Sequence, residues 1–217
     1  EKPIAVDATG VRTFLEAVEK AKGKNLAVLA GTVFRHHKTH VDAIQQLHDG
    51  VIGDIVAGYT YYNTNALWHH PRKAEWSDVE WQVRNWLYFN WLSGDHVVEQ
   101  NVHRIDIQNW VMKGPPKSAY AMGGRQQRVD PMYGHIYDHF AVEYVYENDQ
   151  KQDVRIINTC RQQDGTDTRV TEYYVGTKGI AEPSKGPKSE KRTRPLPLAE
   201  GYIQEHRDLI KSLDDGK

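Results

Sequence analysis

The sequence is poor in cysteine and in long apolar runs. Its one cysteine, Cys160, excludes a disulfide within the chain but does not decide between cytoplasm and periplasm, since exported chains can lack disulfides. No apolar run is longer than a few residues, so we expect neither a transmembrane helix nor a signal peptide. We expect Cys160 to be a small core residue within a strand rather than a nucleophile.

An excess of charge of either sign is also missing. The chain of 217 residues carries 28 Lys and Arg against 29 Asp and Glu, a net charge of -1. A general nucleic-acid binder usually shows a basic excess, so we expect no nucleic-acid partner and no membrane partner. The sequence contains no G-x-G-x-x-G motif, no Walker A motif and no Cys-x-x-Cys pair, so no complete phosphate-binding loop is present.

Histidine and tryptophan, by contrast, are abundant. Of 6 tryptophans, all but one fall between Trp68 and Trp91, in a stretch that also contains Arg84 and Trp86. Flat aromatic rings beside Arg and Asn can stack on a sugar ring and bind its hydroxyl groups. The same cluster is equally compatible with a local aromatic core, so both interpretations stay open.

Hydrophobic periodicity predicts an α+β chain. Asp7 is expected to cap a helix that ends at Gly23, Thr39 to cap a second helix, and residues 94–113 to form one long helix. A last helix is expected over 202–213. The predicted strands are 26–34, 54–63, 117–123, 139–146, 154–161 and 170–176. This order predicts the end of an α/β unit, followed by a helix packed on a mainly antiparallel sheet of about five strands.

The predicted helix 94–113 carries most of the chemistry. On a helical wheel His96, Glu99, His103, Asp106 and Trp110 share one arc of about 80°. A carboxylate one turn from an imidazole orients it and raises its basicity, which suits proton transfer. The wheel places the polar residues Gln100, Asn101, Arg104 and Gln108 on a separate face that should be exposed to water.

The same stripe is compatible with a structural role or a metal site. As a structural feature, it would be a polar seam whose side chains form hydrogen bonds with a neighbouring element. As a metal site, it would hold a divalent ion, because His96, Glu99 and His103 follow i, i+3 and i+7 spacing and could converge on one ion.

Several short motifs, taken in order, resemble the glucose–fructose oxidoreductase, inositol dehydrogenase and MocA family. Glu1-Lys2-Pro3 resembles the motif after the fifth strand of that family's nucleotide-binding domain. His103 and Asp106 match the G-x6-D-x3-H-x2-D pattern of its catalytic helix, with Gly94 close to the leading glycine and Glu99 in the place of the aspartate. Residues 175–180 resemble a late hairpin, and 93–100 and 137–144 resemble a bacterial subgroup, often exported, that acts on sugars.

The resemblance implies a role for individual residues. Lys2, His103 and Glu99 would be catalytic, with His103 as general acid/base at a pKa near 6.5–7. Glu1, Lys2 and Pro3 would contact the cofactor, NAD or NADP. Trp68, Arg84, Trp86, His96 and Arg161 are our candidates for binding the substrate, a secondary hydroxyl of a sugar or sugar derivative.

The resemblance also implies a domain organisation. Residues 1–35 would be the end of a Rossmann-type nucleotide-binding domain, and 36–217 an α+β domain for substrate binding and oligomerisation. The chain would then be a fragment that is inactive by itself, and a homodimer or homotetramer would form through the face of the sheet. A metal-dependent sugar isomerase or lyase, and a non-catalytic carbohydrate-binding domain, remain the alternative functions.

Overall fold

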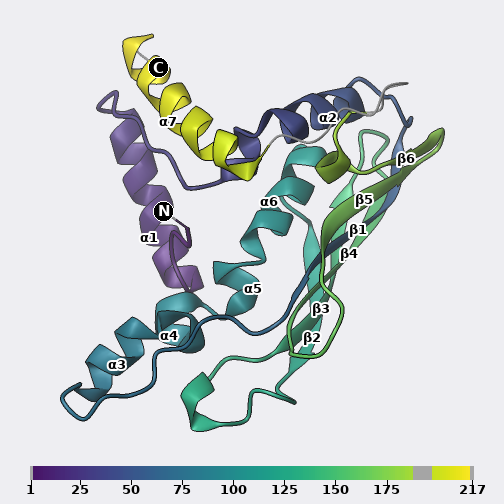
Figure 1. Ribbon diagram of the computed structural model, residues 1–217. Helices are drawn as coiled ribbons and strands as arrows, with labels where there is room; N and C mark the ends of the chain where they lie inside the picture. The colour runs from purple at the N-terminus through teal and green to yellow at the C-terminus, as the bar shows by residue number, and fades with distance from the viewer. Residues whose placement is uncertain (1, 188–196, 216–217) are drawn as a thin grey trace.

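The computed structural model describes residues 2–187 and 197–215. Its longer helices lie on one side of a single sheet, with α1 and α7 farthest from the strands (Figure 1). The α-helices are α1 (Ala8–Lys22), α2 (Lys38–His48), α3 (Asp78–Arg84), α4 (Asn90–Ser93), α5 (His96–Glu99), α6 (Val102–Val111) and α7 (Leu198–Asp214). The 3-10 turns are η1 (Val33–Arg35), η2 (Trp86–Tyr88), η3 (Pro131–Tyr133) and η4 (Pro183–Lys185).

The sheet confirms the predicted α+β class. Its strands are β1 (Ile55–Thr64), β2 (Ser118–Gly124), β3 (His139–Glu147), β4 (Asp153–Gln162), β5 (Arg169–Gly176) and β6 (Gly179–Ala181). They lie in the order β2-β3-β4-β1-β5-β6, and only β1 and β4 run parallel. Strands β1 to β5 match predicted strands to within about one residue, because alternation of side chains between the two faces is a local property of the sequence. Strand β6 is short and forms with β5 the hairpin expected over residues 175–180.

The main core lies between the sheet and helices α2 and α6. Its fully buried members include Ile44 of α2, Ile107 of α6 and Ile156 of β4. Cys160 of β4 faces the same side and is 1% exposed, as expected of a small core residue. Burial at about 25 cal/mol per Å² makes this layer the chief source of stability for the sheet.

A second core lies under the tryptophan-rich stretch. It consists of Leu87, Tyr88, Phe89 and Ile136, with Trp81 and Trp86 packed against it. The aromatic stretch therefore does build a core of its own, beside α3, η2 and α4.

The first helix begins and ends where the sequence predicts. The Asp7 side chain accepts a hydrogen bond from the Gly10 N–H at 2.7 Å, and Gly23 is the C-cap. Helix α2, however, begins at Lys38 with His37 as its N-cap, so the prediction of Thr39 as cap is wrong.

The prediction of a strand over 26–34 is also wrong. Residues 26–32 form no helix or strand, and Val33–Arg35 form the turn η1. A strand needs a neighbouring strand to satisfy its backbone groups, and within the described residues none pairs with this segment. Leu26 and Val28 are 59% and 48% exposed, so this apolar segment is largely open to solvent.

The long helix predicted over 94–113 is interrupted. Helix α5 ends at Glu99 and α6 begins at Val102, while the Asn101 N–H donates to the His96 carbonyl, five residues back, at 2.9 Å. Such a wide turn resembles a π-bulge, which shifts the faces of a helix relative to one another and is frequent at functional sites.

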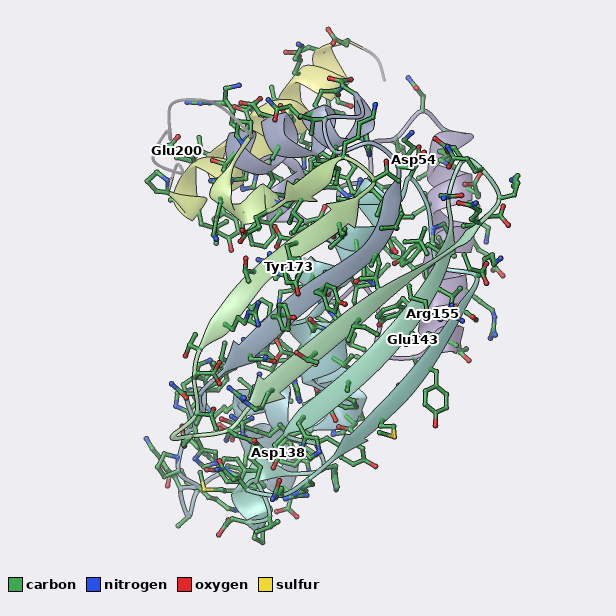
Figure 2. The ribbon with its side chains drawn as sticks, turned by 90° about the vertical axis from the view of Figure 1, so that its right-hand side faces the viewer. Asp54, Asp138, Glu143, Arg155, Tyr173 and Glu200 are labelled. Carbon is green, nitrogen blue, oxygen red and sulfur yellow. The ribbon has the colours of Figure 1, made fainter. Side chains whose placement is uncertain are left out.

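The other face of the sheet carries no helix among the described residues. Figure 2 looks onto this open face, with Tyr173 of β5, Glu143 of β3 and Arg155 of β4 in front of the helices. The rings of Tyr59 and Tyr173 stack at 4.8 Å between centroids, and Arg155 Nε donates to Glu143 at 3.1 Å. No helix in the described part of the chain has the length and apolar character to cross a membrane.

Candidate active site

Lys2 and Glu99, far apart in the sequence, meet at the end of α5. The Lys2 ammonium donates to the backbone carbonyl of Glu99, and its Nζ lies 3.5 Å from the Glu99 carboxylate. The Lys2 side chain is 24% exposed and that of Glu99 is 6% exposed. His103 stands on the first turn of α6, just beyond the bulge, where the charge of Lys2 acts on its imidazole. Of the three residues predicted to be catalytic, Lys2 and Glu99 therefore meet, and His103 lies on the next helix within range of the Lys2 charge.

Burial controls the protonation of this trio. It lowers the pKa of His103 to about 4, and the charges of Lys2 and Arg104 act in the same direction, so the imidazole is neutral near neutral pH. Burial also raises the pKa of Glu99, against the opposing effect of Lys2. Burial therefore places the pKa of His103 below the 6.5–7 expected of a base matched to neutral pH.

Glu99 serves Lys2 rather than His103. In the described residues no hydrogen bond joins the Glu99 carboxylate to the His103 ring, although their spacing predicts one. The bulge at Gln100 and Asn101 separates the two helices that carry them, so they no longer lie one regular turn apart. Glu99 Oε1 is buried without a hydrogen-bond partner, an acceptor that is open to a ligand hydroxyl or a water molecule.

A polar arm that the sequence did not predict supports Glu99 from the sheet. Gln162, at the end of β4, is fully buried and donates to Gln100 Oε1 at 2.6 Å. Its own Oε1 accepts from the guanidinium of Arg128, which lies against the rings of Tyr88 and Tyr133, 5.4 Å from each centroid. These contacts fix the position of Gln162 beside the Glu99 carboxylate.

The supposedly wet face of α6 is buried instead. Asn101, Arg104 and Gln108 are at most 2% exposed and face the sheet. Asn101 donates to Asn158 Oδ1 at 2.6 Å, Asn158 donates to the hydroxyl of Thr60, and that hydroxyl donates to Gln108 Oε1 at 3.2 Å. The error has a clear cause: these polar residues find polar partners on the strands, which a helical wheel cannot show. The inward polar positions of β1 and β4 were the available signal.

His96 does not join the trio. It is 1% exposed, packs on Phe140 at 5.0 Å, and neither ring nitrogen has a hydrogen-bond partner. Burial lowers its pKa to about 3. Among the described residues, no group of three or more His, Cys, Asp or Glu side chains is arranged to hold a metal ion, so His96, Glu99 and His103 do not form the alternative metal site.

The candidate sugar-binding residues of the aromatic stretch are engaged elsewhere. Trp86 packs against the second core. Arg84 forms an ion pair with Glu80 at 2.9 Å and lies over the ring of Trp76, 4.6 Å from its centroid. Trp68 is 46% exposed and packs beside His70 at 5.0 Å. No hydrogen bond, ion pair or ring contact in the described chain joins Trp68, Arg84 or Trp86 to the trio.

Arg161 and Asp106 are also directed away from the trio. Arg161 pairs in register with Asn63 and His139 on the open face of the sheet, whereas Gln162 faces the helices, so Arg161 lies on the opposite side from His103. It hydrogen-bonds the Asp167 carboxylate at 3.1 Å. Asp106 binds Arg35 through both carboxylate oxygens at 2.9 Å. Of the remaining candidates, Pro3 is half-buried and Glu1 lies outside the described residues.

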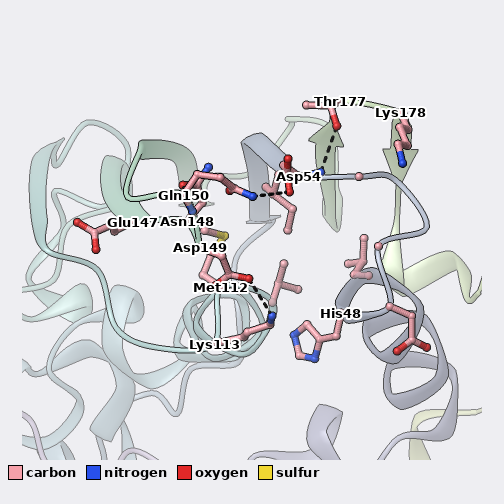
Figure 3. Close-up of a pocket in the computed structure, with 16 residues that line it drawn as sticks. His48, Asp54, Met112, Lys113, Glu147, Asn148, Asp149, Gln150, Thr177 and Lys178 are labelled. Atoms are coloured by element: carbon pink, nitrogen blue, oxygen red, sulfur yellow. Dashed lines mark hydrogen bonds and ion pairs between the residues drawn. The ribbon is translucent and has the colours of Figure 1, made fainter.

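A polar pocket of about 380 Å³ lies at the other end of α6 (Figure 3). Its hydrogen bonds include Gln150 to Asp54 at 2.9 Å and Lys113 to Asp149 at 3.3 Å. Lys113 follows the last turn of α6, about 15 Å along the helix from His103 at 1.5 Å per residue. This pocket is separate from the trio.

Residues 40–182 match the GFO/IDH/MocA C-terminal domain. The chain belongs to the GFO/IDH/MocA family. The match covers more than half of the chain and includes the sheet, both parts of the interrupted helix, Glu99 and His103. The resemblance inferred from the short motifs is thereby confirmed, and the family is one of oxidoreductases.

Solved structures of GFO/IDH/MocA proteins share this fold. Scyllo-inositol dehydrogenase from Lactobacillus casei aligns with a TM-score of 0.67 at 18% identity, over 100% of this chain and 61% of its own. An oxidoreductase from Thermotoga maritima aligns with a TM-score of 0.72 at 18% sequence identity, over 100% of this chain and 60% of its own. Aldose-aldose oxidoreductase from Caulobacter crescentus aligns with a TM-score of 0.70 at 16% sequence identity, over 100% of this chain and 61% of its own.

The chain thus spans about three fifths of the length of these structures. No curated protein matches the sequence. At such identities the comparison shows the fold.

Proposed function

We propose that this chain is the substrate-handling part of an oxidoreductase that removes hydride from a secondary hydroxyl of a sugar or sugar derivative, with NAD or NADP as the acceptor. The observation that carries the proposal is the contact between Lys2 and Glu99, with His103 on the next helix within range of the same ammonium. The names of the structural relatives, which include an inositol dehydrogenase and an aldose oxidoreductase, support a polyhydroxylated substrate.

His103 is suited to take the hydroxyl proton. The hydroxyl proton has to leave as hydride departs and the carbonyl forms, and an unassisted alkoxide is inaccessible near neutral pH. A neutral imidazole accepts that proton, and its burial keeps it neutral. The same burial makes it a weaker base, so it relies on the neighbouring ammonium of Lys2 to stabilise negative charge developing on the oxygen.

Glu99 holds that ammonium in place. The Glu99 carboxylate forms an ion pair with the Lys2 ammonium, while part of the Lys2 side chain stays exposed. The unpartnered Oε1 of Glu99 can accept a hydrogen bond from a second substrate hydroxyl. The trio therefore combines a proton acceptor, a positive charge and a hydroxyl acceptor.

The residues present fit one edge of a dinucleotide site. The bound nicotinamide cofactor supplies the hydride acceptor. The exposed part of Lys2 and the adjoining Pro3 can contact the cofactor beside the substrate, as the family resemblance implies. The sequence contains no glycine-rich loop for the pyrophosphate, so the main cofactor contacts have to come from outside these residues.

We also propose that the open face of the sheet mediates a homodimer or homotetramer. This face carries the stacked Tyr59 and Tyr173, and its edge strand exposes Tyr120 and Met122 at 72% and 66% (Figure 2). An uncovered sheet face on which exposed aromatic side chains lie among charged pairs is compatible with a subunit interface.

The function is tested by assaying the full-length protein with myo-inositol, scyllo-inositol and a panel of aldoses, in the presence of NAD or NADP. We expect formation of reduced cofactor, and we expect His103→Ala to lower kcat by roughly 10²–10⁴-fold with cofactor affinity nearly unchanged. Glu99→Gln should have a smaller effect, because it weakens the hold on Lys2 without removing the base.

The result decides between the candidate functions. A His103→Ala enzyme that keeps more than about half of the wild-type kcat would rule out His103 as the base. Sugar binding without turnover by the wild-type protein would favour a carbohydrate-binding domain. Rescue of a metal-stripped protein by divalent ions would favour the isomerase or lyase.

A further inference from the structure

Phe34 fills the space between two helices next to His103. Its ring meets the His103 imidazole edge-on, with 5.4 Å between centroids and 86° between planes. It packs against His40 of α2 at 4.7 Å, and the guanidinium carbon of Arg104 lies 4.7 Å from its centroid. A single ring from η1 therefore contacts the imidazole of His103 together with side chains of α2 and α6.

The buried ion pair between Arg104 and Glu172 supports the Phe34 ring. Arg104 binds the carboxylate of Glu172 on β5, and both side chains are at most 3% exposed. The second oxygen of Glu172 accepts from the Ser184 N–H at 2.7 Å and lies 3.7 Å from His40 Nε2. Because Glu172 is also held by the Ser184 N–H, Arg104 has little freedom to move away from the Phe34 ring.

The imidazole lacks the restraint that the sequence predicted for it. In residues 2–187 and 197–215, no side-chain hydrogen bond holds the His103 ring, and Glu99 is engaged by Lys2. Within the described residues, the ring contact of the His103 imidazole is with Phe34. An imidazole that acts as a base has to stay within about 3 Å of the reacting oxygen, so a free choice of rotamer would reduce turnover.

We propose that Phe34 is a positioning residue for His103, and that the Arg104–Glu172 ion pair holds Phe34 in place. The meaning of this role for catalysis rests on the proposed function, but the packing itself can be tested without it. In this role Phe34 acts through its contact with the base.

Phe34 also shields His103 from water. The charged groups that face the imidazole are Lys2, which is paired with Glu99, and Arg104 on α6 itself. His40, on the far side of the Phe34 ring, has its own pKa lowered to about 3 by burial. Both cations disfavour protonation of His103, so removing the ring should raise its pKa only as far as the lost desolvation allows.

The packing is tested by histidine-ring NMR on the 217-residue chain, with the His103 signal assigned from a His103→Asn spectrum. Phe34→Leu should shift the His103 ring proton signals and raise its pKa by roughly one unit, because the ring current and the shielding are lost. Phe34→Tyr, which keeps the ring, should preserve both. Phe14→Leu on α1 is the matched control and should change neither.

The outcome is decisive in either direction. A folded Phe34→Leu chain with an unchanged His103 signal and pKa would overturn the proposal; if melting curves show that this variant is unfolded, Phe34→Met replaces it. In the full-length enzyme, Phe34→Leu should lower kcat about tenfold with KM within about twofold, move the acid limb of the kcat–pH profile to higher pH, and be rescued by Phe34→Tyr. If the enzyme shows no dehydrogenase activity while the NMR changes occur, the proposed function fails and the positioning contact stands.

Discussion

At the scale of single residues, burial distinguishes the histidines of this chain. His96 is enclosed with no hydrogen-bond partner, whereas His103 is half-buried beside Lys2. Both are held neutral, but His103 has access to a ligand and His96 has not. A neutral histidine in the core resembles an apolar residue in its packing, which explains the contact between His96 and Phe140.

The stability of the protein should depend on pH through these buried histidines. The pKa of His96 is lowered from 6.5 to about 3, so between these values the unfolded chain binds a proton that the folded chain does not. The contribution of His96 is therefore lost as pH falls below about 6.5, and His40 acts in the same direction. Asp95 opposes them, because burial raises its pKa to about 6.

A single substitution separates the effect of His96 from those of His40 and Asp95. In urea titrations, the stability of His96→Leu relative to wild type should increase by about 2 kcal/mol between about pH 7 and about pH 5. His206→Leu, at an exposed position on α7, should show no such trend. A pH-independent difference for His96→Leu would mean that His96 is protonated alike in the folded and unfolded chains.

At the scale of elements, the interrupted helix determines which side chains meet. The bulge between α5 and α6 turns Glu99 toward Lys2 and leaves His103 against Phe34. The aromatic segment beside it behaves as a small core with an exposed rim, in which Trp86 is packed inward and Trp91 is 54% exposed.

These two tryptophans should respond differently to truncation. Trp86→Ala should lower the free energy of unfolding by about 2 kcal/mol, since it leaves a gap beside Leu87 and Phe89. Trp91→Ala should change it by less than about 0.5 kcal/mol, because it removes little more than a hydrogen bond to Gln82 at the surface. Thermal and urea denaturation measure both values. Equal stability of the two variants, together with a raised KM for Trp86→Ala in the full-length enzyme, would instead favour a direct role in sugar binding.

At the scale of the whole molecule, the chain presents two large uncovered surfaces. One is the apolar surface of α1 and the segment after it, where Leu15, Leu26 and Val28 are 48–59% exposed. The other is the open face of the sheet (Figure 2). The first is consistent with the proposed remnant of a nucleotide-binding domain, and the second with the proposed subunit interface.

The isolated chain should bind NAD(H) poorly. Dinucleotides are held mainly by backbone N–H groups of a glycine-rich loop at a helix N-terminus, and this sequence has no such motif. We expect no binding below roughly millimolar concentration in calorimetric titrations of this chain. Micromolar affinity would show that the described residues suffice for the cofactor.

The proposed assembly should depend on the centre of the open face. Tyr173→Glu places a charge beside Tyr59 and Tyr61 and should shift the protein toward monomers, because an unpaired charge is costly to bury in an interface. Analytical ultracentrifugation of both proteins measures this shift. Glu200→Gln on α7, away from the sheet, is the control; a wild-type monomer at high concentration would contradict the assembly.

The sequence alone determined the local structure of this protein. Alternation along β3 and β4, the cap at Asp7 and the stop at Gly23 depend on neighbours in the chain, so they could be predicted without the fold. Two short motifs, Glu1-Lys2-Pro3 and the pattern around His103, likewise singled out Lys2 and Glu99, which the fold brings into contact.

The tertiary structure decided how those residues are used. The polar face of α6 is buried because Thr60 and Asn158 approach it from the sheet. Gln162 and Glu172, also on strands, set the surroundings of Glu99 and of the Phe34 ring beside His103. Residues 26–34 have strand character but form no strand, because a strand also needs a partner. Periodicity reports which face of an element is apolar, whereas the partner of a buried polar group is set by long-range contacts that bring distant segments together.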